Sequence, residues 1–169
     1  ATGEVLKRLD TEVGSKTDRN GLGGVKLQRD GNQVITAALA GDLKGNMWKF
    51  DLASGDRSKW KVAFDRRPLF RTQDGRPFTA APVLVPHPRG GTMVLAGTGK
   101  LFEPGDERSR AQESLYGLWD QSTMVQDMEG EGTNRRQVGW KWREADPVEA
   151  RFLVTRRQTV SADGRLAYE

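Results

Sequence analysis

The sequence predicts an all-β fold built from β-propeller blades, and three observations support this prediction. Hydrophobic residues occur in short alternating runs bounded by Gly, Asp and Asn, whereas helical periodicity is scarce. The tripeptide Leu39-Ala40-Gly41 recurs as Leu95-Ala96-Gly97, and a lysine-containing turn follows each copy. The repeat distance of about 55 residues suits a blade of four short strands.

The most informative stretch is Ile35 to Leu52, which reads as a β-hairpin. A run of small and β-branched residues ends at Gly41-Asp42, and an alternating strand follows the turn at 44–46. Small alanines suit the inner strands of a blade. Trp48, Phe50 and Trp119 are large enough to fill the space between blades, so we interpret them as packing residues.

We expect the 169 residues to form one partial propeller domain, a two-blade piece of a larger protein. Short alternating runs predict further strands at Trp60–Phe64 and Phe78–Val85, and Pro82 favours a sheet edge because it donates no hydrogen bond. The predicted parts are residues 1–22 (the end of a preceding blade, with a strand at Gly3–Leu9, and a loop), 23–65 (a blade), 66–77 (a connection), 78–143 (a blade with an inserted loop at 103–114) and 144–169 (a tail or the start of a next blade, with a strand at Phe152–Val160).

Composition excludes several classes of protein. Hydrophobic residues make up 36% of the chain and 20 residues are Gly, which is ordinary for a globular domain. The 27 basic and 23 acidic residues are interspersed, whereas nucleic-acid-binding proteins usually cluster their basic residues. The charge pattern therefore indicates an ordinary solvated surface and not a nucleic-acid-binding protein. The chain has no cysteine and no apolar run long enough to span a membrane as a helix, so we expect any export signal to lie outside it.

Glycine-rich segments do not match the known phosphate-binding patterns. Gly97-Thr98-Gly99-Lys100 fails the phosphate-loop pattern, because Val94 stands where the first glycine belongs and Leu101 where the hydroxyl belongs. The segment 21–24 lacks the dinucleotide spacing. We therefore predict no phosphate-binding loop at either place.

Candidate metal ligands and catalytic residues are equally sparse. Asp18-Arg19-Asn20-Gly21 resembles the middle of a calcium loop, but Lys16 and Leu27 occupy its first and last ligand positions. His87 is the single histidine and lies between two prolines in a predicted loop. Asp42, Asp51 and Asp120 follow strands, where we expect them to cap backbone amides. We assign no catalytic, cofactor-binding or metal-binding residue.

A series of short motifs, in this order and spacing, resembles the C-terminal propeller of the type IV pilus tip adhesins, the PilC/PilY group. The resemblance covers about residues 21–120. The motifs are GLGGV at 21–25, AGDLKGNMWKFDL at 40–52, PLF at 68–70, GRPFTAAP at 75–82, HP at 87–88, VLAGTGK at 94–100 and LYGLWD at 115–120.

The resemblance implies a quinoprotein-like propeller without enzymatic activity. It implies a secreted or outer-membrane-associated protein at the pilus tip, acting in fimbrial assembly, twitching motility and cell adhesion. Implied partners are the remaining blades, minor pilins and host or abiotic surfaces, with no nucleic acid and no membrane span. Several family members carry a calcium loop before the AGD segment. Here only Arg29–Gln33 stands there, too poor in oxygen ligands, so we expect no cofactor. A quinone-dependent dehydrogenase is the alternative function.

Overall fold

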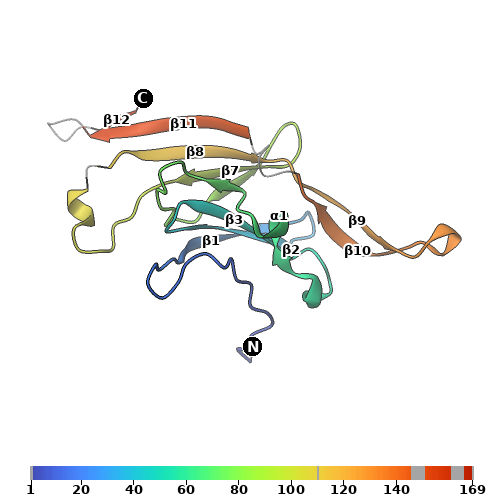
Figure 1. The fold of residues 1–169 in the computed structure, drawn as a ribbon. Helices are drawn as coiled ribbons and strands as arrows, with labels where there is room; N and C mark the ends of the chain where they lie inside the picture. Colours follow the sequence, from blue (N-terminus) through green and yellow to red (C-terminus); the bar gives the residue numbers. More distant parts are fainter. Residues whose placement is uncertain (1, 110, 146–150, 161–165, 169) are drawn as a thin grey trace.

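The computed structural model describes residues 2–109, 111–145, 151–160 and 166–168, and strands dominate this part of the chain (Figure 1). The strands are β1 (Leu22–Arg29), β2 (Ile35–Asp42), β3 (Asn46–Asp51), β4 (Lys61–Val62), β5 (Phe70–Arg71), β6 (Val83–Pro86), β7 (Thr92–Gly97), β8 (Glu113–Asp120), β9 (Thr123–Glu129), β10 (Arg136–Arg143), β11 (Arg151–Val160) and β12 (Leu166–Tyr168). The short helical turns are η1 (Arg57–Lys59), α1 (Ala63–Arg66), η2 (Asp106–Arg108) and η3 (Gly132–Asn134).

The first sheet has the strand order β1-β2-β3-β4, and β5 also pairs with β3. The predicted hairpin is confirmed: β2 and β3 are antiparallel, with Ala40 opposite Trp48. Its turn depends on Gly45, which has a φ of +78° and packs so tightly that a Cβ would collide with the Thr72 side chain. The alternation and the glycine-containing turn therefore predicted both strands of this hairpin.

The second sheet has the order β12-β11-β8-β7-β6 among the described residues. The predicted strand at Phe78–Val85 is confirmed only over Val83–Val85, within β6. β6 is an edge strand among the described residues, and Pro82 lies just before it, outside the strand. The segment at Phe152–Val160 is a strand, but it does not open a separate sheet. It lies within β11, which pairs antiparallel with β8. β8 and β11 are neighbours in the sheet but not in the sequence, and the spacing of the sequence motifs did not predict their pairing.

The residues between β8 and β11 include an arm, the antiparallel hairpin of β9 and β10. This hairpin forms a two-stranded sheet of its own and projects from the body of the molecule (Figure 1). The alternation of Trp140 and Trp142 predicted a strand correctly, but this strand does not join the sheet of the second blade. Trp142 fixes the base of the arm, because its Nε1 donates to Thr36 O at 2.9 Å.

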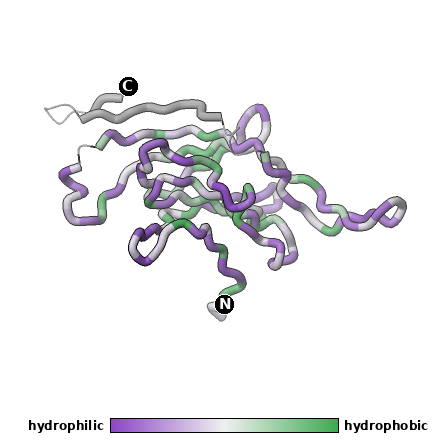
Figure 2. Tube along the Cα trace, viewed as in Figure 1, coloured by the Kyte–Doolittle hydropathy of each residue, from purple (hydrophilic) through white to green (hydrophobic). Residues whose placement is uncertain are grey.

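A hydrophobic cluster joins the two sheets. Hydrophobic segments run through the centre of the molecule, whereas the peripheral loops are mostly hydrophilic (Figure 2). Alternate residues of β2, β3, β7 and β8 face one another there, together with residues of the connecting segments. The buried members are Ala37, Leu39, Met47, Ala63, Phe64, Leu69, Phe78, Val94, Ala96, Tyr116 and Leu118.

The opposite face of the first sheet carries a second cluster, composed of Ala38, Ala40, Trp48, Phe50 and Val62. Trp48 and Phe50 are packing residues here, as predicted. The N-terminal segment covers this cluster with Leu9 and Val13. The predicted strand at Gly3–Leu9 is wrong: this segment is irregular and makes no ladder. Leu9 packs against the second cluster, whereas Val5 and Leu6 are 80% and 51% exposed, so the alternation here marked neither a paired strand nor a buried face.

The predicted strand at Trp60–Phe64 is also mostly wrong, since only Lys61–Val62 forms β4. The chain then enters α1, where Phe64, Asp65 and Arg66 have φ angles of 56°, 52° and 62°. Three consecutive left-handed residues without glycine are rare, because the Cβ crowds the following carbonyl. The turn keeps Phe64 buried and exposes the next two side chains.

Two outer faces remain partly apolar. On the first sheet, Val25 and Leu27 share the face of the second cluster and are 53% and 40% exposed. On the second sheet, the residues that alternate with its buried ones point away from the first sheet. These exposed residues are Val83, Val85, Leu95 and Leu115.

Candidate functional site

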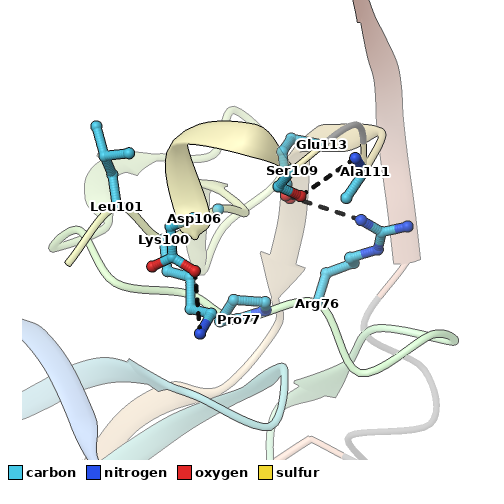
Figure 3. A pocket seen from close by; sticks show the side chains of 9 residues that line it. Arg76, Pro77, Lys100, Leu101, Asp106, Ser109, Ala111 and Glu113 are labelled. Carbon is cyan, nitrogen blue, oxygen red and sulfur yellow. Dashed lines mark hydrogen bonds and ion pairs between the residues drawn. The ribbon is translucent and has the colours of Figure 1, made fainter. Parts of the chain in front are cut away.

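A hollow in the described chain lies between residues 76–77 and the segment that joins β7 to β8 (Figure 3). Its volume is about 610 Å³. Sequence reasoning assigned no site here, although it noted two of the segments involved, the GTGK segment at 97–100 and the predicted insertion at 103–114. The lining residues are Arg76, Pro77, Gly99, Lys100, Leu101, Asp106, Ser109, Ala111 and Glu113.

Hydrogen bonds to the backbone of Gly99 hold the floor of the hollow in place. Phe78 and Gly99 form an isolated parallel bridge, and Gly99 N donates to Pro77 O at 2.8 Å. Thr79 Oγ1 donates to Gly99 O at 2.7 Å. Gly99 has a φ of +130°, which side chains rarely allow. The glycine rejected as a phosphate-loop residue therefore shapes this floor.

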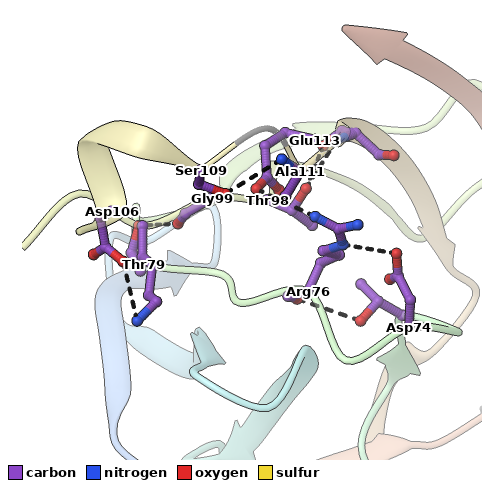
Figure 4. A network of polar contacts seen from close by, with 12 residues as sticks. Asp74, Arg76, Thr79, Thr98, Gly99, Asp106, Ser109, Ala111 and Glu113 are labelled. Carbon is purple, nitrogen blue, oxygen red and sulfur yellow. Dashed lines mark hydrogen bonds and ion pairs between the residues drawn. The ribbon is translucent and has the colours of Figure 1, made fainter. Parts of the chain in front are cut away.

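One wall carries Arg76 and Glu113 (Figure 4). Arg76 Nε donates to Asp74 Oδ2 at 2.7 Å, which fixes the guanidinium. Its Nη1 lies 3.8 Å from Glu113 Oε1, beyond hydrogen-bonding distance. Glu113 Oε2 is buried and has no hydrogen-bond partner among the described residues. This wall thus presents a guanidinium donor beside a carboxylate acceptor that is not directly bonded to it.

The other wall carries Lys100 and Asp106. Lys100 Nζ lies 3.2 Å from Asp106 Oδ1 and also pairs with Glu103. Asp106 Oδ2 accepts the amides of Phe102 and Glu103 at 3.1 and 2.9 Å. The backbone amide of Glu103 is the main cause that lowers the pKa of Asp106, and the side chain of Glu103 is the main cause that raises the pKa of Lys100. Both groups are therefore ionised at neutral pH.

The three strand-end aspartates cap backbone amides, as predicted. Asp51 Oδ1 accepts from Ala53 N at 3.0 Å, and Asp120 Oδ1 accepts from Ser122 N at 3.0 Å. Burial raises the pKa of Asp51. These matching turns end β3 and β8, the two strands that the sequence repeat paired.

Asp42 is the centre of a buried polar network. It accepts hydrogen bonds from Lys44 N and Asn46 N at 2.9 and 2.8 Å, and from the side chains of Asn20, Asn46 and Trp48 at 2.8–2.9 Å. Burial by itself raises the pKa of Asp42, but the hydrogen bonds from Trp48, Asn20 and Asn46 outweigh it and hold the pKa below 3.8. The segment around Asn20 that resembled a calcium loop thus supports the hairpin.

A buried ion pair connects the two sheets. Lys49 on β3 and Asp120 on β8 are 0% and 2% exposed, and Lys49 Nζ lies 2.6 Å from Asp120 Oδ2. The ammonium also lies 3.6 Å from the centroid of the Trp142 ring. Sequence reasoning missed this pair, because nothing in an alternating MWKFD run shows that both faces of the strand are buried.

His87 lies in a turn, as predicted, and stacks on Trp119 with 4.1 Å between ring centroids. Trp119 Nε1 donates to Gly90 O at 2.8 Å. Trp119 was interpreted as filling the space between blades. Within the described chain it contacts this turn and remains partly exposed.

The turn between β1 and β2 does not fit the calcium loop that the family resemblance suggests. Asp30 Oδ1 accepts the amides of Asn32 and Val34, both at 2.9 Å. The Arg29 guanidinium donates to Gln33 O at 2.9 Å. Backbone amides thus already donate to the Asp30 carboxylate, and the cationic side chain of Arg29 bonds within the same turn. Across the described residues, no three His, Cys, Asp or Glu side chains cluster to hold a metal ion.

No helix in the described ranges has the length and apolar character needed to cross a membrane.

Comparison with known proteins places these features in a family. Residues 1–141 match the PilY1 beta-propeller domain. The chain is 39% identical over 147 residues to the type IV pilus biogenesis factor PilY1 of Pseudomonas aeruginosa PAO1, covering 72% of this chain and 12% of that protein. A PilY1 homolog of Xylella fastidiosa is 30% identical over 143 residues, covering 74% of this chain and 10% of the homolog.

A solved structure agrees. The crystal structure of the Pseudomonas aeruginosa PilY1 C-terminal domain superimposes with a TM-score of 0.58 at 28% identity, covering 90% of this chain and 38% of that one. The chain is therefore a partial β-propeller with two blade sheets among its described residues. It spans about a tenth of the length of these PilY1 relatives.

Proposed function

The chain belongs to the PilY1 β-propeller family, and from this we propose that it is a non-enzymatic module of a pilus-tip protein, acting in type IV pilus assembly and surface attachment. The family match carries the proposal. The printed function of the relatives, type IV pilus biogenesis, supports the assembly role. The adhesive role draws on the motif resemblance and on the charged hollow beside the GTGK segment at 97–100. The proposed location is the cell surface, at the pilus tip or associated with the outer membrane.

The first proposed partners are further blades of the same propeller. Two sheets do not close a ring, since propellers usually have four to eight blades. The solved PilY1 domain extends well beyond the part that this chain covers. The exposed apolar residues on both outer faces, such as Val25 and Val83, support neighbours on each side. Minor pilins and surface ligands are proposed as partners of the complete protein.

We further propose that the β1–β2 turn works without calcium, because Asp30 and Arg29 satisfy it internally. The test compares melting temperatures of the full-length protein and its Asp30→Ala variant, each with calcium chloride and with a chelator. We expect the same calcium response in both proteins. A response present in the parent and lost in the variant would overturn this point.

The test of the main proposal is gene deletion in the organism that carries the gene, complemented with the full-length protein or its Asp42→Ala variant. Because Asp42 organises the β2–β3 hairpin, we expect the variant to lose surface pili and attachment, whereas Glu4→Gln restores both. Shearing of pili, attachment counts and an immunoblot of protein level are the readouts. Normal piliation and attachment in the deletion strain would contradict the proposal.

The absence of enzymatic activity needs a separate assay. The purified full-length protein is incubated with pyrroloquinoline quinone, calcium and a panel of alcohols and sugars, and reduction of a redox dye is followed. We expect no dye reduction above that of the heat-denatured protein. Turnover that depends on the quinone would replace the proposed role with a dehydrogenase.

A further inference from the structure

We propose that the hollow bounded by Arg76, Lys100, Asp106 and Glu113 is a binding site for a neutral saccharide. This inference rests on the proposed adhesive function and names the chemical class of its ligand. It starts from an imbalance on the Arg76 wall. Glu113 Oε2 has no hydrogen-bond partner among the described residues, and the Glu113 side chain is 31% exposed, so its carboxylate lacks a donor and is accessible to one from the hollow.

A hydroxyl group suits the space beside these two residues. Arg76 Nη1 and Glu113 Oε1 are 3.8 Å apart, so they pair electrostatically without a direct hydrogen bond. A ligand hydroxyl both donates and accepts, and it can therefore bond the carboxylate and the guanidinium at once. A cation satisfies only the carboxylate and an anion only the guanidinium.

The opposite wall repeats this combination of charges. Lys100 and Asp106 supply another donor and another acceptor 3.2 Å apart. Asp106 is held by two backbone amides, so its position does not depend on the ligand. A ligand that spans the hollow must present hydroxyls at two ends. The four lining charges cancel, which favours a neutral ligand over a phosphate or an ammonium.

The remaining lining is apolar and suits the C–H faces of a sugar ring. Pro77, Leu101 and Ala111 contribute apolar surface, and the next residue after Leu101, Phe102, is 60% exposed. The hydrogen bonds of Gly99 with Pro77 and Thr79 fix the floor of the hollow. Its volume of about 610 Å³ lies within the range of small-molecule sites.

The experiment uses the full-length protein and ligand-observed NMR with galactose, mannose, N-acetylglucosamine and lactose. Glucose 6-phosphate and glucosamine serve as anionic and cationic probes. We expect saturation transfer to at least one neutral sugar. Glu113→Gln should weaken its binding about 10- to 100-fold, because it removes a charge-assisted hydrogen bond. Glu107→Gln makes the same change in the same loop outside the lining and should leave binding unchanged.

A second variant, Ala111→Phe, fills the hollow without changing charge and should also abolish binding, while near-ultraviolet circular dichroism checks the fold of each protein. Binding of none of the neutral sugars, exclusive binding of a charged probe, or full binding by both folded variants would overturn the inference. Piliation is measured in parallel. If the variants keep pili and lose attachment, site and function stand together. If no sugar binds while gene deletion removes pili and attachment, only the saccharide assignment fails.

Discussion

Asp42 shows how a single side chain sets the geometry of the central hairpin. Its two oxygens collect the amides of Lys44 and Asn46 and the side-chain donors of Asn20, Asn46 and Trp48. A turn, a core tryptophan and the loop before β1 are thereby fixed to one another. The carboxylate accepts what would otherwise be unpaired buried donors.

We predict that Asp42→Asn lowers the free energy of unfolding by about 2–4 kcal/mol, because an amide cannot accept all of these hydrogen bonds. The low pKa of Asp42 adds a pH dependence. Its contribution is present above about pH 3.8 and is lost as the pH falls through the lower folded pKa. Urea unfolding from pH 2 to pH 7 measures both, with Glu4→Gln as the control. Equal acid sensitivity of parent and variant would contradict the second part.

Asp51 should behave in the opposite way. Burial raises its pKa, so ionisation of Asp51 costs stability above the folded pKa, and protonation recovers it as the pH falls. Asparagine can still accept the Ala53 amide. We therefore expect Asp51→Asn to raise the melting temperature at pH 7, and the gain to shrink towards pH 3 in scanning calorimetry. A lower melting temperature at pH 7 would show that the electrostatic attraction of Lys61 and Lys49 for the Asp51 carboxylate dominates.

The ion pair of Lys49 and Asp120 links the two sheets, but it buries two charges. We predict that Lys49→Met lowers the free energy of unfolding by about 3–5 kcal/mol, since it leaves Asp120 buried without its counter-charge. The double variant Lys49→Met, Asp120→Asn should recover more than half of that loss. Denaturant unfolding of the full cycle provides the coupling energy, and additive losses would contradict the prediction.

At the scale of elements, α1 is the most strained turn of the described chain. Asp65 is exposed and holds a φ of 52°, a conformation that suits glycine better than any residue with a Cβ. We predict that Asp65→Gly raises the free energy of unfolding by about 0.5–1 kcal/mol, whereas Asp65→Ala does not. Thermal unfolding of the two variants distinguishes release of strain from loss of the carboxylate. An equal gain in both would rule out strain.

Elements differed in how far the sequence could predict them. The β2–β3 hairpin was predictable because the alternation, the glycine turn and the repeat agreed. The predicted strand at Gly3–Leu9 was wrong because a short alternating run does not by itself supply a partner strand: Val5 and Leu6 are exposed, and Leu9 packs on the face of the first sheet without pairing. The place of β11 in the second sheet was not predicted, because the arm separates β11 from its partner β8 along the sequence.

The candidate site was harder to predict than the fold. The predicted turn at Gly97–Lys100 is wrong, because Gly97 ends β7 and Gly99 forms a bridge with Phe78. The neighbours of this segment in the hollow come from a second segment, around Arg76. Sequence alone does not show which distant loops meet. The unsatisfied oxygen of Glu113 is likewise a property of three-dimensional packing. By contrast, the capping roles of Asp51 and Asp120 follow from local turn chemistry and were predicted correctly.

At the scale of the whole molecule, the exposed outer faces predict association of this 169-residue piece. Val83, Val85, Leu95 and Leu115 form an apolar strip on the second sheet, and apolar strips on edge blades pair readily. We expect self-association that rises with concentration in light scattering. Val83→Lys together with Val85→Glu should reduce it. A monomer at all concentrations would contradict this prediction, which does not concern the complete protein.

The arm leaves and rejoins the body at one place, since Thr123 and Arg143 are paired at its base. Its length is therefore decoupled from the spacing of the blades, provided that Trp142 keeps its bond to Thr36. Evolution or an engineer can extend or shorten the outer part in hairpin steps without changing the register of β8 with β11. The turn at Gly132–Asn134 is accordingly a suitable position at which to insert an epitope or a fluorescent label.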